Sequence, residues 1–447
     1  MTQQQPIPPF SGAPHQQRPK LRAIRGFATQ HNEQVLMGLA DARQISDKIV
    51  LTSPQFQLVL PHLNGQNDLD AIVKLVGRGL ERAVLEQFIA QLDDAALLEG
   101  PVFDGVLAKM RADFDSSESL PPGASAQAGE ALAAQELGEN STEDQRRELA
   151  PRKLREAMDQ WISQALEKAE DPSFDALPRA VIAPHLDYWR GWMNYAHVYG
   201  RLRVVDNPDR VVILGTNHFG TGTGVTACDK GYESPFGTLA LDKDLLERVK
   251  SKLGPENSEI LLRHRYDHER EHSIELHIPW IQHTLGDSKS GAGPKVLGVL
   301  VHDPAVNNGE SYDGNGLGIL PFIEALKAAI AEMPGKTLIV ASADLSHVGQ
   351  SFGDQTPIMG ETPEADAFRT KVLTHDQEML ALVEQGRAED LVSSMAWQQN
   401  PTRWCSIGNL VATLKLTDAP SVRRLNYAGV GDQQGVAFVT SYAGVIA

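Results

Sequence analysis

The alternation of apolar and polar positions along the chain predicts two kinds of structure. Between residues 26 and 112 the apolar positions follow the spacing of short amphipathic helices. The first lies in DLDAIVKLVG, where Asp68 is placed to cap it, and the next in ERAVLEQFIAQLDDAALLEG, which we expect to end at Gly100. The preceding KIVLTSPQFQLVLPHL begins with a short apolar run and continues with helical spacing. Three short helices and a strand predict a small winged-helix unit.

In the last two thirds of the chain, short apolar runs alternate with helical patterns. An amphipathic helix is expected over residues 151–169. Three apolar runs follow, each leading to a histidine: RAVIAPH to His185, RVVILGTNH to His218, and TLIVASADLSH through Asp344 to His347. Such runs are typical of buried strands in α/β proteins, and ligands bind at the edge where these strands end. The pattern therefore predicts an α/β domain with polar side chains gathered at one edge of its sheet.

Two further segments differ from both patterns. Residues 1–25 are rich in Pro and Gln and carry four basic residues, which predicts a disordered tail. Residues 113–144 contain eight acidic residues and neither Lys nor Arg, and their composition is typical of a flexible linker. The expected organisation is therefore a tail over 1–25, a winged-helix domain over 26–112, an acidic linker over 113–144 and an α/β domain over 145–447.

Charge and composition argue against several function classes. The net charge is −17 at pH 7, which disfavours nucleic-acid binding, because phosphate contacts need clustered Lys and Arg. The two cysteines, Cys228 and Cys405, are too few for a disulfide framework and fit a reducing compartment. No apolar stretch is as long as a membrane span, and the N-terminal residues lack the apolar run of a secretory signal. We therefore expect a cytoplasmic protein with no membrane contact.

The histidines at the three strand ends are candidates for one polar site. A single His after a strand is more often a structural residue, but three from distant strands make a shared site as plausible as a structural role. Cys405 adds a further candidate, because it precedes Gly408 and an apolar run with helical spacing. A helix N-terminus favours a thiolate, which is a metal ligand or a nucleophile. A buried apolar cysteine is the alternative.

A different candidate motif lies between His268 and His272. HEREH matches H-E-x-x-H, in which two His on one helix face bind zinc and the Glu is the general base of a protease. The surrounding RHRYDHEREH is charged almost throughout, whereas such a helix needs an apolar face beneath the metal. Apolar helical spacing begins only at Ile274, with Pro279 in an early turn. We therefore interpret His268 as a chance match and not as a zinc ligand.

Seven motifs occur in one order along residues 178–447: APHLDY, LGTNHFG, ESPFGTLALD, HEREHSIELHIPW, SADLSHVG, WCSIGNL, and LNYAG with SYAGVIA. Together they resemble the MEMO family, which shares its fold with the class III extradiol ring-cleaving dioxygenases. The resemblance implies a mixed-sheet α/β domain of that type. It also implies a metal site on His185, His218 and Cys405, in which Cys replaces the Glu of the dioxygenases. By the same resemblance His347 is the acid–base residue, with Asp344 beside it.

Other motif residues are expected around this site. His272, Glu275 and His277 form the centre of EHSIELHIP, and the resemblance places them in the pocket wall or behind a ligand His. A buried hydrogen-bonded pair that only stabilises the fold would also explain them. Asp187 of APHLDY and Asn217 of LGTNHFG are expected nearby.

The chain departs from the family pattern beside two of the expected ligands. Phe219 stands where a second His is common, and Cys405 is followed by Ser-Ile-Gly-Asn where CGRHP is common. Two imidazoles and a thiolate suit one transition metal ion, and we expect Fe(II) or Cu, with Zn a further candidate. The implied function is a metal-dependent oxidoreductase acting on a peptide, a protein or a small aromatic substrate. The alternative is a non-catalytic peptide-binding protein with a structural or vestigial metal.

The first domain is similar to PqqD-like peptide-recognition domains over residues 28–100. The likeness rests on VLTSPQFQLVLPHLNGQNDLDAIVKLVG, with the pattern set by Leu63, Gly65, Leu69 and Ile72. Such winged helices add a peptide strand to a sheet edge, and use in dimerisation is the alternative. Bacterial MEMO-like proteins often belong to the AmmeMemoRadiSam group as its protein B. This implies an AMMECR1-like protein and a radical-SAM enzyme as partners.

Overall fold

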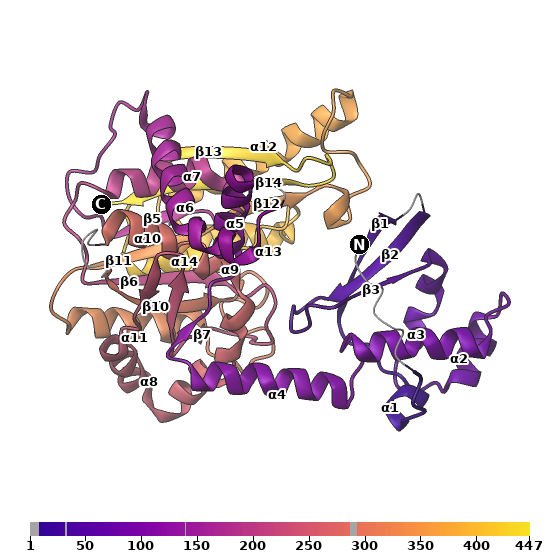
Figure 1. Ribbon diagram of the computed structural model, residues 1–447. Helices are drawn as coiled ribbons and strands as arrows, with labels where there is room; N and C mark the ends of the chain where they lie inside the picture. Colours follow the sequence, from indigo (N-terminus) through magenta and orange to yellow (C-terminus); the bar gives the residue numbers. More distant parts are fainter. Residues whose placement is uncertain (1–8, 32–33, 139, 287–292) are drawn as a thin grey trace. The chain divides into compact units, whose positions relative to one another are not determined.

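The computed structural model describes residues 9–31, 34–138, 140–286 and 293–447 (Figure 1). Within it the chain divides into two compact units, Met1–Ser117 and Glu118–Ala447. Each unit has its own hydrophobic core, so each is described by itself.

The first unit is a three-stranded antiparallel sheet packed against helices. Its strands pair in the order β1 (Ile24–His31), β2 (Gln34–Asp41) and β3 (Ile49–Thr52). Its helices are α1 (Pro14–Gln17), α2 (Leu69–Val76), α3 (Arg82–Asp94) and α4 (Pro101–Ser116), with the 3₁₀ turns η1 (Pro54–Leu58) and η2 (Leu60–His62) before α2. The predicted cap of α2 is confirmed, because Asp68 accepts a hydrogen bond from the Ala71 amide at 2.9 Å.

Helix α3 ends six residues before the predicted Gly100, and the reason lies in the tertiary structure. After Asp94 the chain turns back, with Ala96 at a positive φ of 55°. Leu97 then accepts a hydrogen bond from the Arg22 amide at 2.9 Å. Gly100 instead precedes α4, which the sequence pattern did not predict.

The prediction of a disordered tail over residues 1–25 is wrong for the part that the structure describes. Residues 1–8 lie outside the described residues, but the chain from residue 9 is packed against the first unit. Gln16 is buried and donates from Nε2 to Asp93 at 2.7 Å. Arg22 forms a buried ion pair with Asp41, with 3.1 Å between Nη1 and Oδ2. These polar contacts hold a segment whose composition alone suggests disorder.

The second unit is built on an eight-stranded mixed sheet, which confirms the predicted α/β class. The strand order is β12-β14-β5-β11-β6-β10-β7, and β13 pairs with β14 outside this path. The parallel centre consists of β5 (Ala180–Ala183), β11 (Thr337–Ser342), β6 (Arg210–Thr216) and β10 (Lys295–Val301). The antiparallel strands are β7 (Thr226–Ala227), β12 (Asp344–Val348), β13 (Arg423–Gly431) and β14 (Phe438–Ile446).

Helices pack on this sheet because successive residues of its buried strands point to opposite faces. Ile182, Val212 and Ala341 join the core that includes α14 (Ile407–Leu416), α11 (Ile319–Ala331) and α8 (Lys243–Arg263). Helix α7 (Tyr188–Leu202) contacts β5 and β14, and the short α9 (His272–Glu275) contacts β6. The second unit also contains α10 (Ile278–Leu285), α12 (Pro363–Glu384), α13 (Ala388–Gln398), and η3 and η4 (Arg265–Arg270, Gln350–Phe352).

The prediction of a flexible linker over residues 113–144 is also wrong, because most of this segment is folded. After α4 ends, β4 (Ser119–Leu120) pairs in parallel with β8 (Gly231–Ser234), which in turn pairs with β9 (Gly237–Leu239). Helix α5 (Ala124–Leu137) then packs along α6 (Glu143–Leu166) (Figure 1).

Two features explain why this acidic segment folds. Gly129 lies so close to α6 that an added Cβ would be 3.1 Å from the Cβ of Ala150. The acidic side chains of α5 pair with bases of α6, as in Arg147 with Glu130 at 3.3 Å and Arg152 with Glu136 at 2.8 Å. The segment is therefore one half of a helical hairpin, and the boundary between units lies at 117/118.

None of the helices in the described ranges is long and apolar enough to cross a membrane.

Candidate metal centre

The ends of neighbouring parallel strands bring the predicted ligands together. His185 follows β5 and His218 follows β6, and both strands pair with β11 between them. Cys405 stands just before α14, and its carbonyl accepts a hydrogen bond from Thr216 Oγ1 at 3.1 Å. The start of α14 is therefore attached to the end of β6, and the three side chains meet at one edge of the sheet.

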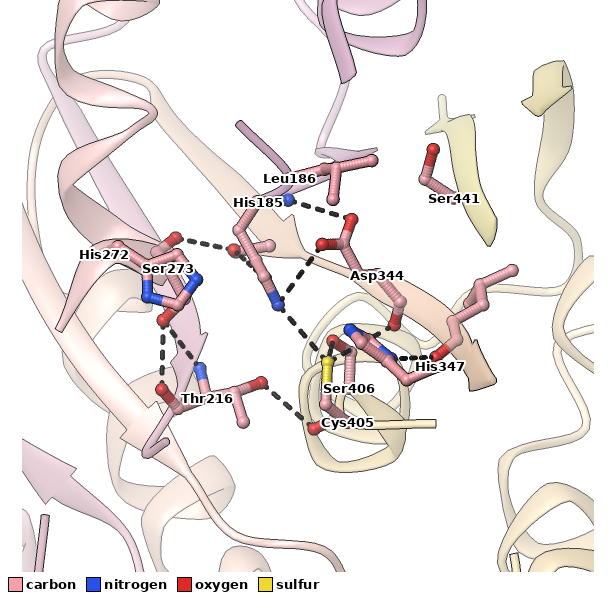
Figure 2. Close-up of polar contacts among 12 residues, drawn as sticks. His185, Leu186, Thr216, His272, Ser273, Asp344, His347, Cys405, Ser406 and Ser441 are labelled. Atoms are coloured by element: carbon pink, nitrogen blue, oxygen red, sulfur yellow. Dashed lines mark hydrogen bonds and ion pairs between the residues drawn. The ribbon is translucent and has the colours of Figure 1, made fainter. Parts of the chain in front are cut away.

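The candidate ligand atoms of His185, His218 and Cys405 all lie within 4.8 Å of one another. His185 Nε2 is 3.3 Å from Cys405 Sγ, and Figure 2 shows these two groups pointing toward each other. The ring centroids of the two histidines are 5.0 Å apart. Two imidazole nitrogens and one sulfur at this spacing form a set that can hold one transition metal ion.

Each of these imidazoles has its Nδ1 bound to a fixed acceptor. The Ser342 hydroxyl donates to the Ser273 carbonyl at 2.6 Å, so it accepts from His185 Nδ1, which lies 2.9 Å away. His218 Nδ1 donates to Glu271 Oε1 at 3.0 Å. In metal sites the second nitrogen of a ligand His usually has such a partner, which fixes the tautomer and the ring direction. Both rings therefore present Nε2 to the centre.

The charges of these groups follow from burial and from the pairing with Glu271. Burial, with help from the neighbouring His218, lowers the pKa of His185 well below its ordinary value. Burial also opposes charge on His218, but the Glu271 carboxylate and the neighbouring Cys405 outweigh it and raise the pKa of His218 well above the ordinary value. For Glu271 burial acts against ionisation, yet His218 lowers its pKa to about 2. Without a metal, His185 is thus neutral while His218 and Glu271 form an ion pair.

Asp344 and His347 lie on the side of His185 that faces away from His272 (Figure 2). Asp344 Oδ1 accepts a hydrogen bond from the His185 amide at 3.2 Å, and burial raises the pKa of Asp344 to about 7. His347 Nδ1 donates to the Leu345 carbonyl at 2.8 Å, so Nε2 keeps its lone pair. Burial lowers the pKa of His347 to about 4. Figure 2 shows Asp344, His347 and Cys405 grouped beside His185.

The strand that carries His347 differs from the prediction. TLIVASADLSH was expected to be one strand with His347 just beyond its end, but it forms two. β11 ends at Ser342, and Asp344–Val348 form β12, which runs antiparallel to β14. His347 therefore lies within an edge strand, with a register shift between it and Asp344.

The other predicted pocket residues divide into two groups. His272 belongs to the centre, since its ring lies 4.9 Å from that of His218 and 5.6 Å from that of His185. Asn217 supports the loop after β6, because its Oδ1 accepts from the Gly220 amide at 2.8 Å. Asp187 caps α7, where it accepts from the Arg190 amide at 3.2 Å.

Glu275 and His277 instead contact groups outside the ligand set. Glu275 is buried at the N-terminus of α5, where its Oε1 accepts from the Gly123 and Ser125 amides at 3.2 Å each. His277 packs on the ring of Tyr195, and its Nδ1 lies 2.8 Å from the Tyr199 hydroxyl. Of the interpretations left open for them, a buried and stabilising role agrees with these contacts.

The H-E-x-x-H match does not form a zinc site. His268 lies in η3 and His272 begins α9, so the two histidines do not share one helix face. His268 is buried, with Nε2 donating to the Thr226 carbonyl at 3.1 Å and Nδ1 2.9 Å from the Tyr232 hydroxyl. Both of its ring nitrogens are therefore occupied.

Two acidic residues near the centre were missed by the sequence analysis. Glu271 binds His218 through both the ring and the amide, at 3.0 and 2.7 Å, and lies 3.3 Å from Nδ1 of His272. Asp267 holds the loop after His218, because its Oδ2 accepts from the Asn217 side chain at 2.8 Å and from the Gly222 amide at 2.7 Å. The only sequence signal was their place in the charged stretch before Ile274.

Comparison with known proteins shows what this chain is similar to. A family model described as Memo-like protein matches residues 148–446, more than half of the chain. A MEMO1 family protein of Desulfurococcus amylolyticus is 29% identical over 202 residues, which covers 44% of this chain and 64% of that protein. One of Methanopyrus kandleri is 26% identical over 60% of this chain and 82% of its own length. One of Sulfolobus acidocaldarius is 32% identical over 38% of this chain and 53% of its own length.

Proposed function

Since the chain belongs to the family of Memo-like proteins, we propose that it is a metal-dependent oxidoreductase with one metal ion on His185, His218 and Cys405. The observation that carries the proposal is the convergence of three ligand atoms within 4.8 Å. Both imidazoles are held by Nδ1 partners, as ligand histidines usually are.

The donor set fits a redox metal. Two imidazoles and a thiolate suit Fe(II) or Cu, with Zn a further candidate. When bound, Fe or Cu would supply a Lewis acid and a redox centre, whereas Zn would supply a Lewis acid alone. Ring cleavage of the extradiol type does not follow, because a thiolate stands where the dioxygenases have a carboxylate.

The chain's own residues can hold and move protons next to the ligands. His347 is neutral near pH 7 and has a free Nε2, so it can accept a proton from a substrate hydroxyl. The carboxyl of Asp344, with a pKa of about 7, can release or take up a proton in the same range. We assign the acid–base role to His347 and the supporting role to Asp344.

The substrate class is a peptide or protein, or a small aromatic molecule. A peptide is supported by the small antiparallel sheet of the first unit, where β1 and β3 are edge strands to which a peptide strand could add. This unit would then act as a PqqD-like recognition domain, with AMMECR1-like and radical-SAM proteins as partners in the cytoplasm.

The test is metal analysis of the protein purified without oxygen, together with His185→Ala and Cys405→Ser. We expect about one Fe or Cu per chain in the wild type and loss of most of it in both variants, because a three-ligand site cannot spare a ligand. Circular dichroism would show that the variants fold. A folded wild-type protein that binds no metal would overturn the proposal in favour of a non-catalytic peptide-binding protein.

A further inference from the structure

Helix α12 carries a buried carboxylate that the proposed chemistry does not use. Asp376 is fully buried. Among the described residues its ion-pair contact is with His375, whose Nδ1 is 4.0 Å from Oδ1, and no Lys or Arg pairs with it. A buried carboxylate without a strong cation is costly unless several donors satisfy it.

Four neutral side chains supply these donors. Oδ1 accepts from the Ser346 hydroxyl at 2.5 Å and from Trp404 Nε1 at 2.7 Å. Oδ2 accepts from the Tyr427 hydroxyl at 2.6 Å and from Thr440 Oγ1 at 2.5 Å. Burial alone would raise the pKa of Asp376, but the contact with His375 and the hydrogen bonds from Ser346, Thr440 and Tyr427 lower it, so the group is an anion near neutral pH.

The two donors on Oδ1 are direct neighbours of site residues in the chain. Trp404 precedes Cys405, and Ser346 precedes His347. One carboxylate oxygen therefore links the segment that carries the candidate sulfur ligand to the strand that carries the candidate acid–base group.

A second link from the same helix reaches His347. His375 Nδ1 lies 3.2 Å from Thr402 Oγ1, and the Thr402 carbonyl accepts from the His347 amide at 2.8 Å. Helix α12, which lies outside the motifs, thus contacts the side chains of Ser346, Trp404 and Thr402, which lie next to the site residues in the chain or are hydrogen-bonded to one of them.

We propose that Asp376 is the positioning residue that sets the direction of the Cys405 sulfur and of the His347 ring at the metal centre. The proposal rests on the proposed function, because it assigns a role at the same site. Of the hydrogen bonds to Asp376, the one from Trp404 to Oδ1 is made by the residue next to Cys405 in the chain. The Tyr427 bond to Oδ2 is of the same kind and nearly the same length, but Tyr427 does not adjoin a site residue.

This difference is tested with two variants, Trp404→Phe and Tyr427→Phe. Each removes one hydrogen bond to Asp376 and keeps an aromatic ring, and Trp404→Phe also removes the 3.2 Å contact from Nε1 to Ser346 Oγ and part of a buried ring. The probe is Co(II), added to metal-free protein without oxygen, and the readout is the thiolate-to-cobalt charge-transfer band together with the Kd. For Trp404→Phe we expect a shifted band and a Kd weaker by roughly ten- to a hundredfold. For Tyr427→Phe we expect the wild-type band and Kd, even if its Tm falls.

A second readout needs no metal. Alkylation of Cys405 by iodoacetamide, followed by mass spectrometry of the labelled peptide, reports the position and environment of the sulfur. Cys228 is fully buried, so it does not compete. The rate should change in Trp404→Phe and in Asp376→Asn, which keeps the shape but loses the charge, and should stay at the wild-type value in Tyr427→Phe.

Equal effects of Trp404→Phe and Tyr427→Phe on the band and on the alkylation rate would overturn the positioning role and leave Asp376 a purely structural residue. If wild-type protein binds no Co(II), the proposed metal function fails, and the alkylation rates alone decide whether Asp376 positions Cys405.

Discussion

His185 and His268 are both buried, yet their ring nitrogens are used in opposite ways. His185 has one nitrogen bound to Ser342 and the other directed at Cys405, whereas His268 has both nitrogens bound to groups of the fold. A histidine can serve as a ligand only if one nitrogen keeps its lone pair for the metal. The hydrogen-bond partners thus distinguish the candidate ligand from the structural histidine, which the spacing of residues in the sequence could not do.

The first prediction compares these two histidines. His268→Ala should leave the metal content nearly unchanged, because His268 offers no free nitrogen, while His185→Ala should lose most of the metal. Metal per chain is measured in both variants after circular dichroism has shown that they fold. Loss of metal in His268→Ala together with retention in His185→Ala would restore the zinc-protease interpretation.

The second prediction concerns Glu271, which holds His218. Glu271→Gln replaces one accepting oxygen by a donor that faces the His218 amide or ring, so the ring loses its fixed direction. We expect a loss of roughly ten- to a hundredfold in metal affinity. Glu275→Gln, four residues further along and equally buried, is the control and should bind metal like the wild type. Competition with a chelator of known affinity measures both, and equal losses would contradict the orienting role of Glu271.

The convergence of the three candidate ligands could be predicted because each of them belongs to a short motif in a fixed order. The residues that hold these side chains in place could not be predicted. Glu271 was hidden in a charged stretch, where a carboxylate is most simply interpreted as solvated. Asp376 lies in α12 outside every motif, and its partners come from four other segments of the chain.

Among the helices and strands, too, some could be predicted from the sequence and others could not. β5, β6 and β11 were predicted because a strand buried on both faces has an apolar run that composition makes visible. The hairpin of β1 and β2 was missed, since IRGFATQH and QVLMGLAD mix apolar and polar residues without a clear period. Helix α5 was interpreted as a linker because its buried positions are small residues such as Gly129 and Ala133, which contribute little apolar signal.

The third prediction concerns the attachment of α5. Its N-terminus is held by the buried Glu275, which also belongs to α9 next to His272. In Glu275→Gln the side-chain amide brings a donor to a group of backbone donors, at a cost of about 1–3 kcal/mol. Amide hydrogen exchange should become faster over residues 123–137, with no change in α14. Unchanged exchange there would mean that packing on α6 alone holds the helix.

At the scale of the whole molecule, the boundary between the two units decides which segments fold together with the candidate metal centre. Composition placed the start of the α/β domain at residue 145, but β4 and α5 belong to the second unit, which begins at Glu118. The error has a physical cause: acidic side chains that look solvated in the sequence are paired with the bases of α6.

The fourth prediction compares two fragments, 118–447 and 145–447. The longer one keeps every contact of the second unit, so it should fold and bind metal like the full chain. The shorter one begins inside α6 without its Thr142 cap, loses the β4–β8 pairing and removes the α5 donors from the Glu275 carboxylate. Hydrogen bonds to a charged group contribute about 1.5–3 kcal/mol, so their loss corresponds to a Tm lower by roughly 5–10 °C. Differential scanning calorimetry of both fragments measures this shift. Equal Tm values would show that α5 does not contribute to the stability of the second unit, and the linker interpretation of residues 113–144 would return.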